Sequence, residues 1–193
     1  MTKTDLSEDE TMENIGVVCG RFQIFHNEHL EYVLAAKARC ARLIVGITSP
    51  DPSCSPVEAA DPARSAAAAN PCSYYERMQM VESVLLEAGV PREEFDIVPF
   101  PIGKPELISC YIPQDACIFV TVLDQWGHTK VQRLRDAGYR VEVLWERDKK
   151  GVSSTMLRSM IQSGEEWDKF VPDATYRYLA AFNIDMRIRD AEA

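Results

Sequence analysis

The chain has 193 residues, with 30 acidic against 21 basic side chains and a formal net charge of −9 at pH 7. This length is typical of one domain, and a hydrophobic content of 46% is enough for a substantial core. The acidic balance argues against nonspecific binding to nucleic acid or to an anionic membrane. It does not exclude one polyphosphate ligand, because local donors decide that.

No stretch of 18 apolar residues is present and the N-terminal segment is polar, so we expect neither a membrane span nor a signal peptide. Residues 1–13 are predicted to form a disordered tail, followed by a single domain over 14–193. The six cysteines include no CxxC pair and no His cluster at ligand spacing, which argues against a zinc site. We therefore expect a cytoplasmic protein with reduced thiols, and Cys19, Cys40 and Cys117 as small core residues.

Strand and helix patterns alternate along the chain. Apolar runs predict strands at 15–19, 43–48, 95–98, 117–122 and 139–145. Helical spacing and capping signals predict helices at 28–42, 74–87, 125–137 and 153–162, with one or two more after about residue 167. This order predicts an α/β fold, a Rossmann-like doubly wound parallel sheet with right-handed crossovers and C-terminal helices.

Residues 49–72 interrupt the alternation with five prolines and a run of alanines. A segment this long without structure of its own is uncommon unless it is functional or disordered. It is either a solvated insertion or a mobile flap over the acceptor substrate, because it leaves the carboxyl end of the second predicted strand.

The segment GRFQIFHNEH, residues 20–29, follows the first predicted strand and opens the first helix. A strand, a tight turn and a helix start bring backbone N–H groups and the helix dipole together at a place suited to an anion. His26 and His29 are three residues apart and therefore lie on one face of the first helical turn. The pattern indicates phosphoryl or nucleotidyl chemistry.

These ten residues resemble the GRFQPFHxGH signature of the HIGH-motif nucleotidyltransferase superfamily. A second segment, GVSSTMLR at 151–158, resembles the ISxTxIR element of that superfamily. Two matches in the expected order are far more specific than either alone. Within the superfamily the chain is similar to archaeal-type nicotinamide-mononucleotide adenylyltransferases and to cytidylyltransferases that activate small phosphonates.

The resemblance implies transfer of a nucleoside monophosphate from a triphosphate to a small phosphonate or phosphate acceptor, with release of pyrophosphate. Mg²⁺ would accompany the triphosphate, and no metal ligands are expected from the protein. Cytidylyl transfer from CTP is favoured narrowly over adenylyl transfer from ATP to nicotinamide mononucleotide. A third reading is a nucleotide-binding regulator without turnover. A homo-oligomer is compatible with the sequence.

The resemblance also assigns roles to particular residues. The implied catalytic residues are His26, His29, Arg21 and Arg158. The implied nucleotide-binding residues are Gly20, Arg21, Phe22, Gln23, His26, His29, Ser153, Ser154 and Thr155. The expected acceptor-binding residues are Arg77, Trp126 and Asp124.

Each assignment has a structural alternative, and for His26 and His29 it is a role as helix-capping or core histidines. The hydroxyls at 153–155 could serve as a plain helix N-cap. Arg77 follows a stretch similar to the NPFxxxER pattern of the family, yet it could be an exposed helical arginine. Trp126 could equally be a buried anchor, and His128 is expected to be structural or exposed.

Two positions depart from the family signature, Ile24 in place of proline and Glu28 in place of glycine. Glycine would let a nucleotide approach the backbone closely. The Glu28 carboxylate either packs aside against a cation such as Arg21 or shapes the pocket for the base and ribose. We favour the second expectation, because the residue lies between the two histidines.

Overall fold

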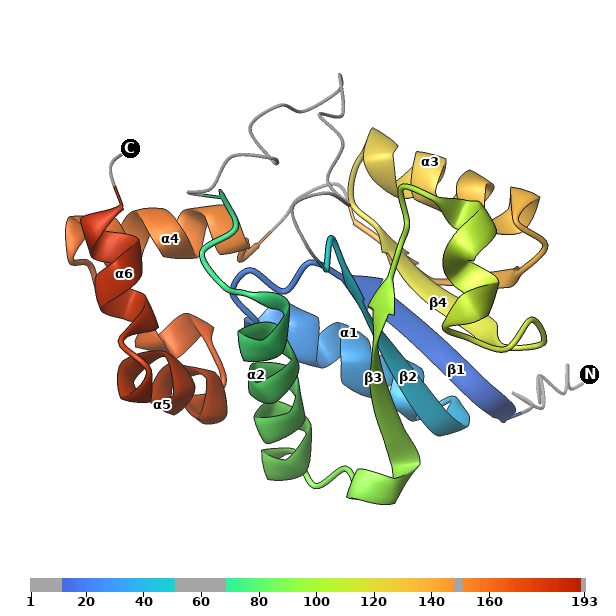
Figure 1. Ribbon diagram of the computed structural model, residues 1–193, viewed down its shortest axis with the longest axis horizontal. Helices are drawn as coiled ribbons and strands as arrows, with labels where there is room; N and C mark the ends of the chain where they lie inside the picture. The colour runs from blue at the N-terminus through green and yellow to red at the C-terminus, as the bar shows by residue number, and fades with distance from the viewer. Residues whose placement is uncertain (1–11, 51–68, 148–150, 192–193) are drawn as a thin grey trace, which may run out of the picture.

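The computed structural model describes residues 12–50, 69–147 and 151–191. In this part of the chain, parallel strands form a five-stranded sheet with the order β3-β2-β1-β4-β5, as Figure 1 shows. The strands are β1 (Glu13–Gly20), β2 (Cys40–Thr48), β3 (Phe95–Phe100), β4 (Cys117–Val122) and β5 (Arg140–Glu146). The α-helices are α1 (Asn27–Lys37), α2 (Tyr74–Glu87), α3 (Gln125–Asp136), α4 (Ser154–Ser163), α5 (Asp173–Ala181) and α6 (Ile184–Asp190). Short 3₁₀ helices are η4 (Arg92–Glu94), η5 (Pro105–Cys110) and η6 (Asp168–Phe170).

The core has two halves, one on each face of the sheet. Successive residues of a strand point to opposite faces, so Val17 packs with α3 and η5 while Val18 packs with α1, α2 and the C-terminal helices. The central strands carry apolar side chains on both faces, which is typical of a buried parallel sheet. The predicted doubly wound α/β fold is confirmed.

Most predicted boundaries agree with the structure, and the disagreements have local causes. Helix α2 and strand β4 have the predicted bounds, and Ser73 and Glu76 form the expected capping box. The helix predicted over 28–42 was too long, because α1 ends at Lys37 and residues 40–42 pair with β1. No glycine or proline marks this helix end, so the apolar spacing alone could not locate it.

Other boundaries differ by one to three residues. Glu13, placed in the predicted tail, is the first residue of β1 and pairs with Cys40. Strand β3 continues through Pro99, which is tolerated because β3 is an edge strand. Residues 1–11 and most of the proline-rich segment, 51–68, lie outside the described residues, so the predictions of a tail and of a flap are not tested.

The predicted C-terminal helices are present as α5, which packs against α2, and α6, which packs against α4 and α5 (Figure 1). The backbone N–H of Ala174, in α5, donates to the Glu87 carboxylate at 2.8 Å. Arg187, in α6, forms an ion pair with Glu76 at 2.9 Å, at the start of α2. The C-terminal helices therefore extend the α2 face of the sheet.

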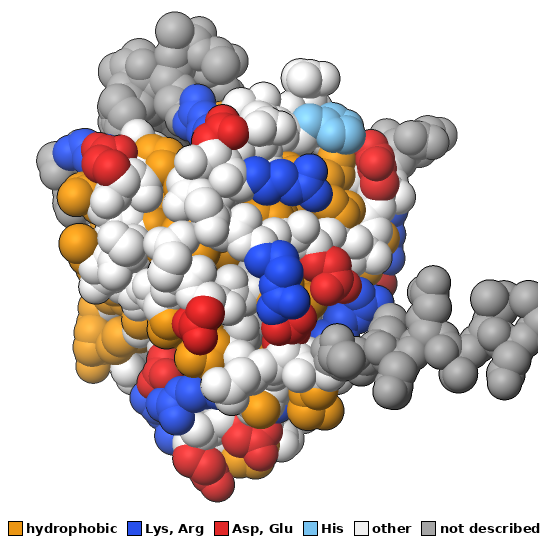
Figure 2. All heavy atoms as spheres, turned by 90° about the vertical axis from the view of Figure 1, so that its right-hand side faces the viewer, with side chains coloured by type: hydrophobic (Ala, Val, Ile, Leu, Met, Phe, Trp, Pro, Cys, Tyr) orange, Lys and Arg blue, Asp and Glu red, His pale blue; other side chains and the backbone are white. Residues whose placement is uncertain are grey.

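The face on the side of α3 carries acidic and basic side chains interspersed with hydrophobic ones, as Figure 2 shows. The view shows no broad patch of one sign on this face. Among the described residues, no helix is long and apolar enough to cross a membrane.

The sheet opens between its central strands toward their carboxyl ends. Strands β1 and β4 pair only at Gly16–Cys117 and Val17–Ile118. Beyond that point the Tyr32 hydroxyl of α1 fills the gap, accepting from the Cys19 N–H at 3.3 Å and donating to the Phe119 carbonyl at 2.6 Å. The strand order also reverses between β1 and β4, and the crevice at such a point is where doubly wound sheets bind ligands.

Replacing Tyr32 with phenylalanine should lower the free energy of unfolding by about 1–3 kcal/mol, since it leaves a buried N–H and a buried carbonyl without this partner. Denaturant unfolding measures the change. Tyr176→Phe is the control, because that side chain is 45% exposed. Equal stability of Tyr32→Phe and the wild type would contradict the bridging role.

Candidate active site

The turn between β1 and α1, residues 20–25, is shaped by two aromatic side chains. Phe22 has a left-handed backbone conformation with a φ of 53°, and its ring is 1% exposed. A Cβ at Gly20 would lie 2.7 Å from that ring, so glycine lets the phenylalanine fold back over the strand end. A strained non-glycine residue of this kind is often found at functional sites. The Phe22 side chain is therefore part of the core, so only the backbone of this residue is available to contact a nucleotide.

The Phe22 and Phe25 rings hold the His29 imidazole in place. The His29 ring meets Phe22 edge-on with centroids 5.0 Å apart, and it lies 5.5 Å from Phe25. On its other side it stacks on His26 at 3.6 Å. The structure thus brings the two predicted catalytic histidines together as a stacked pair at the start of α1.

The same two histidines form a reciprocal cap of α1. The Nδ1 atom of His26, the N-cap residue, accepts from the His29 backbone N–H at 3.4 Å, and the His29 Nδ1 accepts from the His26 N–H at 3.3 Å. An Nδ1 atom that accepts a hydrogen bond carries no proton, so each neutral ring has its proton on Nε2. The capping geometry therefore assigns the tautomer of both rings.

Burial reinforces the neutral state. It lowers the pKa of His26 to about 4. It also lowers the pKa of His29 well below the ordinary range, with further lowering from His26 and Arg21 and an opposing hydrogen bond to the Ile24 carbonyl. Both rings are neutral N–H donors at pH 7 in the ligand-free protein.

Three carbonyl groups of the 20–25 turn receive hydrogen bonds from side chains of distant helices. Arg77 of α2 donates to the Arg21 carbonyl at 2.9 Å, and Arg158 of α4 donates to the Gln23 carbonyl at 2.6 Å. Ser154, also of α4, donates to the Ile24 carbonyl at 3.0 Å. These contacts join the two sequence motifs into one site.

Arg77 is 2% exposed, which rules out the alternative of an exposed helical arginine in this structure. Besides the bond to Arg21, its guanidinium donates to the carbonyls of Thr48, Ser49 and Ser73 at 2.8–3.2 Å. It thereby connects the first motif, the end of β2 and the start of α2. Burial lowers its pKa. The hypothesis that it binds the acceptor stays a prediction.

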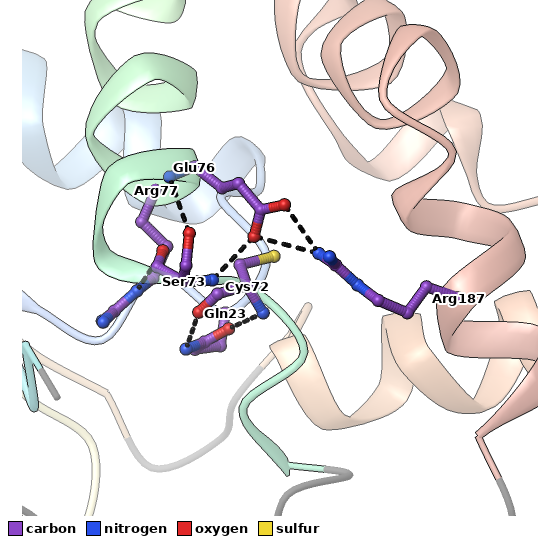
Figure 3. Close-up of polar contacts among 6 residues, drawn as sticks. All are labelled: Gln23, Cys72, Ser73, Glu76, Arg77 and Arg187. Carbon is purple, nitrogen blue, oxygen red and sulfur yellow. Dashed lines mark hydrogen bonds and ion pairs between the residues drawn. The ribbon is translucent and has the colours of Figure 1, made fainter. Parts of the chain in front are cut away.

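Figure 3 shows a second connection beside Arg77. The Gln23 side-chain amide donates to the Cys72 carbonyl and accepts from the Cys72 N–H, both at 2.9 Å. Cys72 immediately precedes the N-cap of α2, and burial raises the pKa of its thiol to about 12. Gln23, predicted to bind nucleotide, is itself buried and fixes the approach to α2.

The second motif begins α4. Ser153 is its N-cap and accepts from the Met156 N–H at 3.2 Å, so the capping alternative describes this hydroxyl correctly. The Thr155 hydroxyl is exposed in the first turn and accepts from Arg158 at 3.2 Å. Arg158 is 7% exposed, and burial lowers its pKa. This helix start remains suited to an anion through its N–H groups.

The other predicted residues lie beyond the carboxyl end of β4. Asp124 is exposed and caps α3 through the Gly127 N–H at 3.0 Å. Trp126 is partly exposed, with the Arg133 guanidinium 4.9 Å from its ring centroid. His128 is exposed and lies 3.1 Å from the Glu146 carboxylate, as the structural alternative predicted. Acceptor binding by Asp124 and Trp126 stays a prediction.

Glu28 points toward the second motif. Its Oε1 accepts from the Val152 N–H at 2.9 Å. The partner is a backbone amide, whereas the first expectation was a cation. The favoured expectation, that Glu28 shapes the pocket for the base and ribose, stays a prediction. No local pattern predicts this contact, which joins residues 124 positions apart.

The cysteines at 19, 40 and 117 are buried as predicted, and those that the structure describes are free thiols. Within the described ranges, no group of three or more His, Cys, Asp or Glu side chains could hold a metal ion. Tyr32 escaped the sequence analysis. Its position three residues after His29, on the same face of α1, is the signal that could have identified it.

Known proteins resemble this chain over most of its length. Residues 17–160 match the model of the cytidylyltransferase-like family. The chain is 47% identical to a phosphonoformate cytidylyltransferase of Streptomyces viridochromogenes, covering 93% of this chain and 98% of the relative. It is 26% identical to a nicotinamide-nucleotide adenylyltransferase of Saccharolobus solfataricus, covering 91% and 95% respectively.

Solved structures share the fold. A bifunctional NMN adenylyltransferase/ADP ribose pyrophosphatase of Francisella tularensis, complexed with AMP and a manganese ion, has a TM-score of 0.64 at 18% identity, covering 92% of this chain. This chain spans about half, 52%, of that protein. A nicotinate-nucleotide adenylyltransferase-like structure from Vibrio parahaemolyticus has a TM-score of 0.58 at 11% identity, covering 93% of this chain and 98% of the other. The resemblance predicted from the two motifs is confirmed.

The depressed pKa of His26 predicts a pH-dependent stability. Because its folded value, about 4, lies below the ordinary value of 6.5, the unfolded chain takes up a proton first as the pH falls. The stabilisation is complete above pH 6.5 and is lost as the pH falls toward 4, amounting to about 2 kcal/mol between pH 7 and 5.

Denaturant unfolding at pH 7 and pH 5 measures this loss. His26→Asn keeps a capping acceptor without the titrating ring, so its stability should fall by about 2 kcal/mol less than that of the wild type. His128→Asn, which removes an exposed imidazole, is the control. A loss in His26→Asn as large as in the wild type would contradict the assignment.

Proposed function

Because the chain belongs to the cytidylyltransferase-like family, we propose that it transfers a cytidylyl group from CTP to a small phosphonate acceptor and releases pyrophosphate. The observation that carries the proposal is the 47% identity to a phosphonoformate cytidylyltransferase along almost the full length of both chains. Adenylyl transfer to nicotinamide mononucleotide is the second candidate, supported by relatives at 26–28% identity.

The reaction is an in-line displacement at the α-phosphorus of CTP. An acceptor oxyanion forms a new P–O bond while the bond to the β-phosphate breaks, and both electrons leave with pyrophosphate. No protein nucleophile is needed, so the contribution of the protein is positioning and charge stabilisation.

We assign that stabilisation to the histidine pair and the start of α4. The stacked rings of His26 and His29 carry their protons on Nε2, so they can donate to phosphoryl oxygens without first taking up a proton. The His29 ring would exchange its hydrogen bond to the Ile24 carbonyl for one to the phosphoryl group. Fixed donors of this kind each contribute a few kcal/mol to transition-state stabilisation. The backbone N–H groups at Ser154 and Thr155, with the Thr155 hydroxyl, are our candidates for holding the β- and γ-phosphates.

Other assignments follow from position. Arg21 supplies a positive charge close enough to His29 to lower its pKa, which supports a role in binding phosphate. Asp124 and Trp126, beyond the end of β4, are our candidates for the acceptor side. Arg158 and Gln23 hold the turn through backbone contacts, and we assign them to positioning the nucleotide site.

A divalent cation fits this site when it enters bound to the triphosphate, because Mg²⁺ then needs few protein ligands. The serine and threonine hydroxyls at the start of α4 are hard oxygen donors of the kind it prefers. The cation would neutralise charge on the triphosphate. We also propose a cytoplasmic location, where the free thiols would stay reduced.

The test is a matrix of ATP, CTP, GTP and UTP against small phosphonates and nicotinamide mononucleotide, followed by detection of pyrophosphate. CTP with a phosphonate should give the highest kcat/KM. A preference for ATP with nicotinamide mononucleotide would establish the second candidate. Nucleotide binding without pyrophosphate release would identify a regulator instead.

His29→Ala should lower kcat about a hundredfold or more, since it removes a transition-state donor. Circular dichroism and thermal unfolding check that the fold is retained, and His128→Ala serves as the matched control. Turnover near the wild-type value would contradict the catalytic assignment of His29.

Arg77 tests whether a buried arginine can also bind the acceptor. Its contacts with the first motif and with the ends of β2 and α2 predict that Arg77→Lys lowers stability and raises the KM of both substrates. An increase confined to the acceptor KM, with stability unchanged, would instead support direct acceptor binding.

A further inference from the structure

The Glu28 side chain joins the first turn of α1 to the residues that precede α4. The hydrogen bond from the Val152 N–H to Oε1 is 2.9 Å long. Val152 directly precedes Ser153, the N-cap of α4, so the carboxylate holds the second motif one residue before its helix begins. Glu28 is partly buried at this contact.

Gly151 fits the carboxylate closely. A Cβ at this position would lie 2.2 Å from the Glu28 Oε1 and 3.4 Å from its Cδ. A side chain at Gly151 would therefore displace the Glu28 carboxylate from its hydrogen bond with Val152.

A second contact of α1 lies one turn farther along the helix. Glu31 and Arg147 form a two-pronged ion pair, with Oε1–Nη2 and Oε2–Nη1 distances of 2.6 and 3.2 Å. The Arg147 guanidinium also lies 4.8 Å from the Trp145 ring centroid, and its backbone N–H donates to the Val122 carbonyl at 3.0 Å. Residues Arg147 and Val152 are thus both held by acidic side chains of α1.

We propose that Glu28 is a positioning residue for the second motif, and that Glu28 and Gly151 form a matched pair. The carboxylate fixes Val152, and with it the start of α4, in the binding geometry before the triphosphate arrives. Ordering this segment in advance removes an entropic cost from nucleotide binding. This inference rests on the proposed function for its kinetic readout alone.

The charge of Glu28 is consistent with this role. A carboxylate near a polyanion is unfavourable unless donors and positive charge surround it. Here it accepts a backbone N–H and lies in the first turn of α1, where the helix dipole favours a negative charge. The pKa of Arg147 is raised mainly by its hydrogen bond with Glu31 and further by the charge of Glu28, so a cation lies near this carboxylate.

The kinetic test compares Glu28→Ala with Glu28→Gln. The alanine variant should raise the KM for CTP about tenfold while the KM for the acceptor changes less than twofold. The glutamine variant retains an oxygen acceptor for the Val152 N–H, so it should restore most of the CTP affinity. A lower KM for CTP in either variant would overturn the proposal, because Glu28 would then compete with the triphosphate.

The structural test is a double-mutant cycle that needs no substrate. Gly151→Ala should lower the unfolding midpoint in the wild type but have little effect in the Glu28→Ala background, because the clash is with the Glu28 carboxylate. Glu31→Ala is the control background, in which Gly151→Ala should remain as costly as in the wild type.

The two arms separate the possible failures. Equal costs of Gly151→Ala in all three backgrounds would overturn the matched pair. If Glu28→Ala removes the cost of Gly151→Ala as expected, but the wild type transfers no cytidylyl group, the result counts against the proposed function and not against the matched pair. In that case, calorimetry of CTP binding takes the place of the KM measurement. The same CTP affinity in Glu28→Ala as in the wild type would overturn the positioning role of Glu28.

Discussion

The site depends on how the turn after β1 satisfies its backbone carbonyls. Three of them, at Arg21, Gln23 and Ile24, accept hydrogen bonds from Arg77, Arg158 and Ser154. A buried carbonyl without a partner costs about 1–3 kcal/mol, so the turn keeps its shape only while α2 and α4 are docked. The same contacts bring the two motifs together.

Arg77 and Arg158 are both buried, and they donate to backbone carbonyl oxygens and, from Arg158, to the Thr155 hydroxyl. A planar guanidinium suits this use, because its donors point in several fixed directions at once. Its positive charge also remains beside a site proposed to bind a polyanion. Arginine thus both fixes the shape of the turn and places positive charge beside the proposed nucleotide site.

The histidine pair combines capping with chemistry in a similar way. Reciprocal bonds to backbone N–H groups direct the proton of each ring to Nε2, and packing by Phe22 and Phe25 fixes the His29 ring. The cost of such an arrangement is sensitivity to acid, because protonation at Nδ1 removes the acceptor. On the amino-terminal side of the gap that Tyr32 bridges, β1 pairs with both β2 and β4. This paired part of the sheet gives the site a rigid support.

The sequence by itself determined the parallel α/β fold, the bounds of α2 and β4, and the two motifs that form the site, because these depend on local periodicity, capping and spacing. It placed the end of α1 too late, since no local breaker marks it. Only the tertiary structure decided that Arg77 is buried, that Glu28 bonds to Val152, and that Tyr32 bridges β1 and β4. These contacts join residues that are far apart in the chain, and no local pattern encodes which distant backbone group a polar side chain will meet.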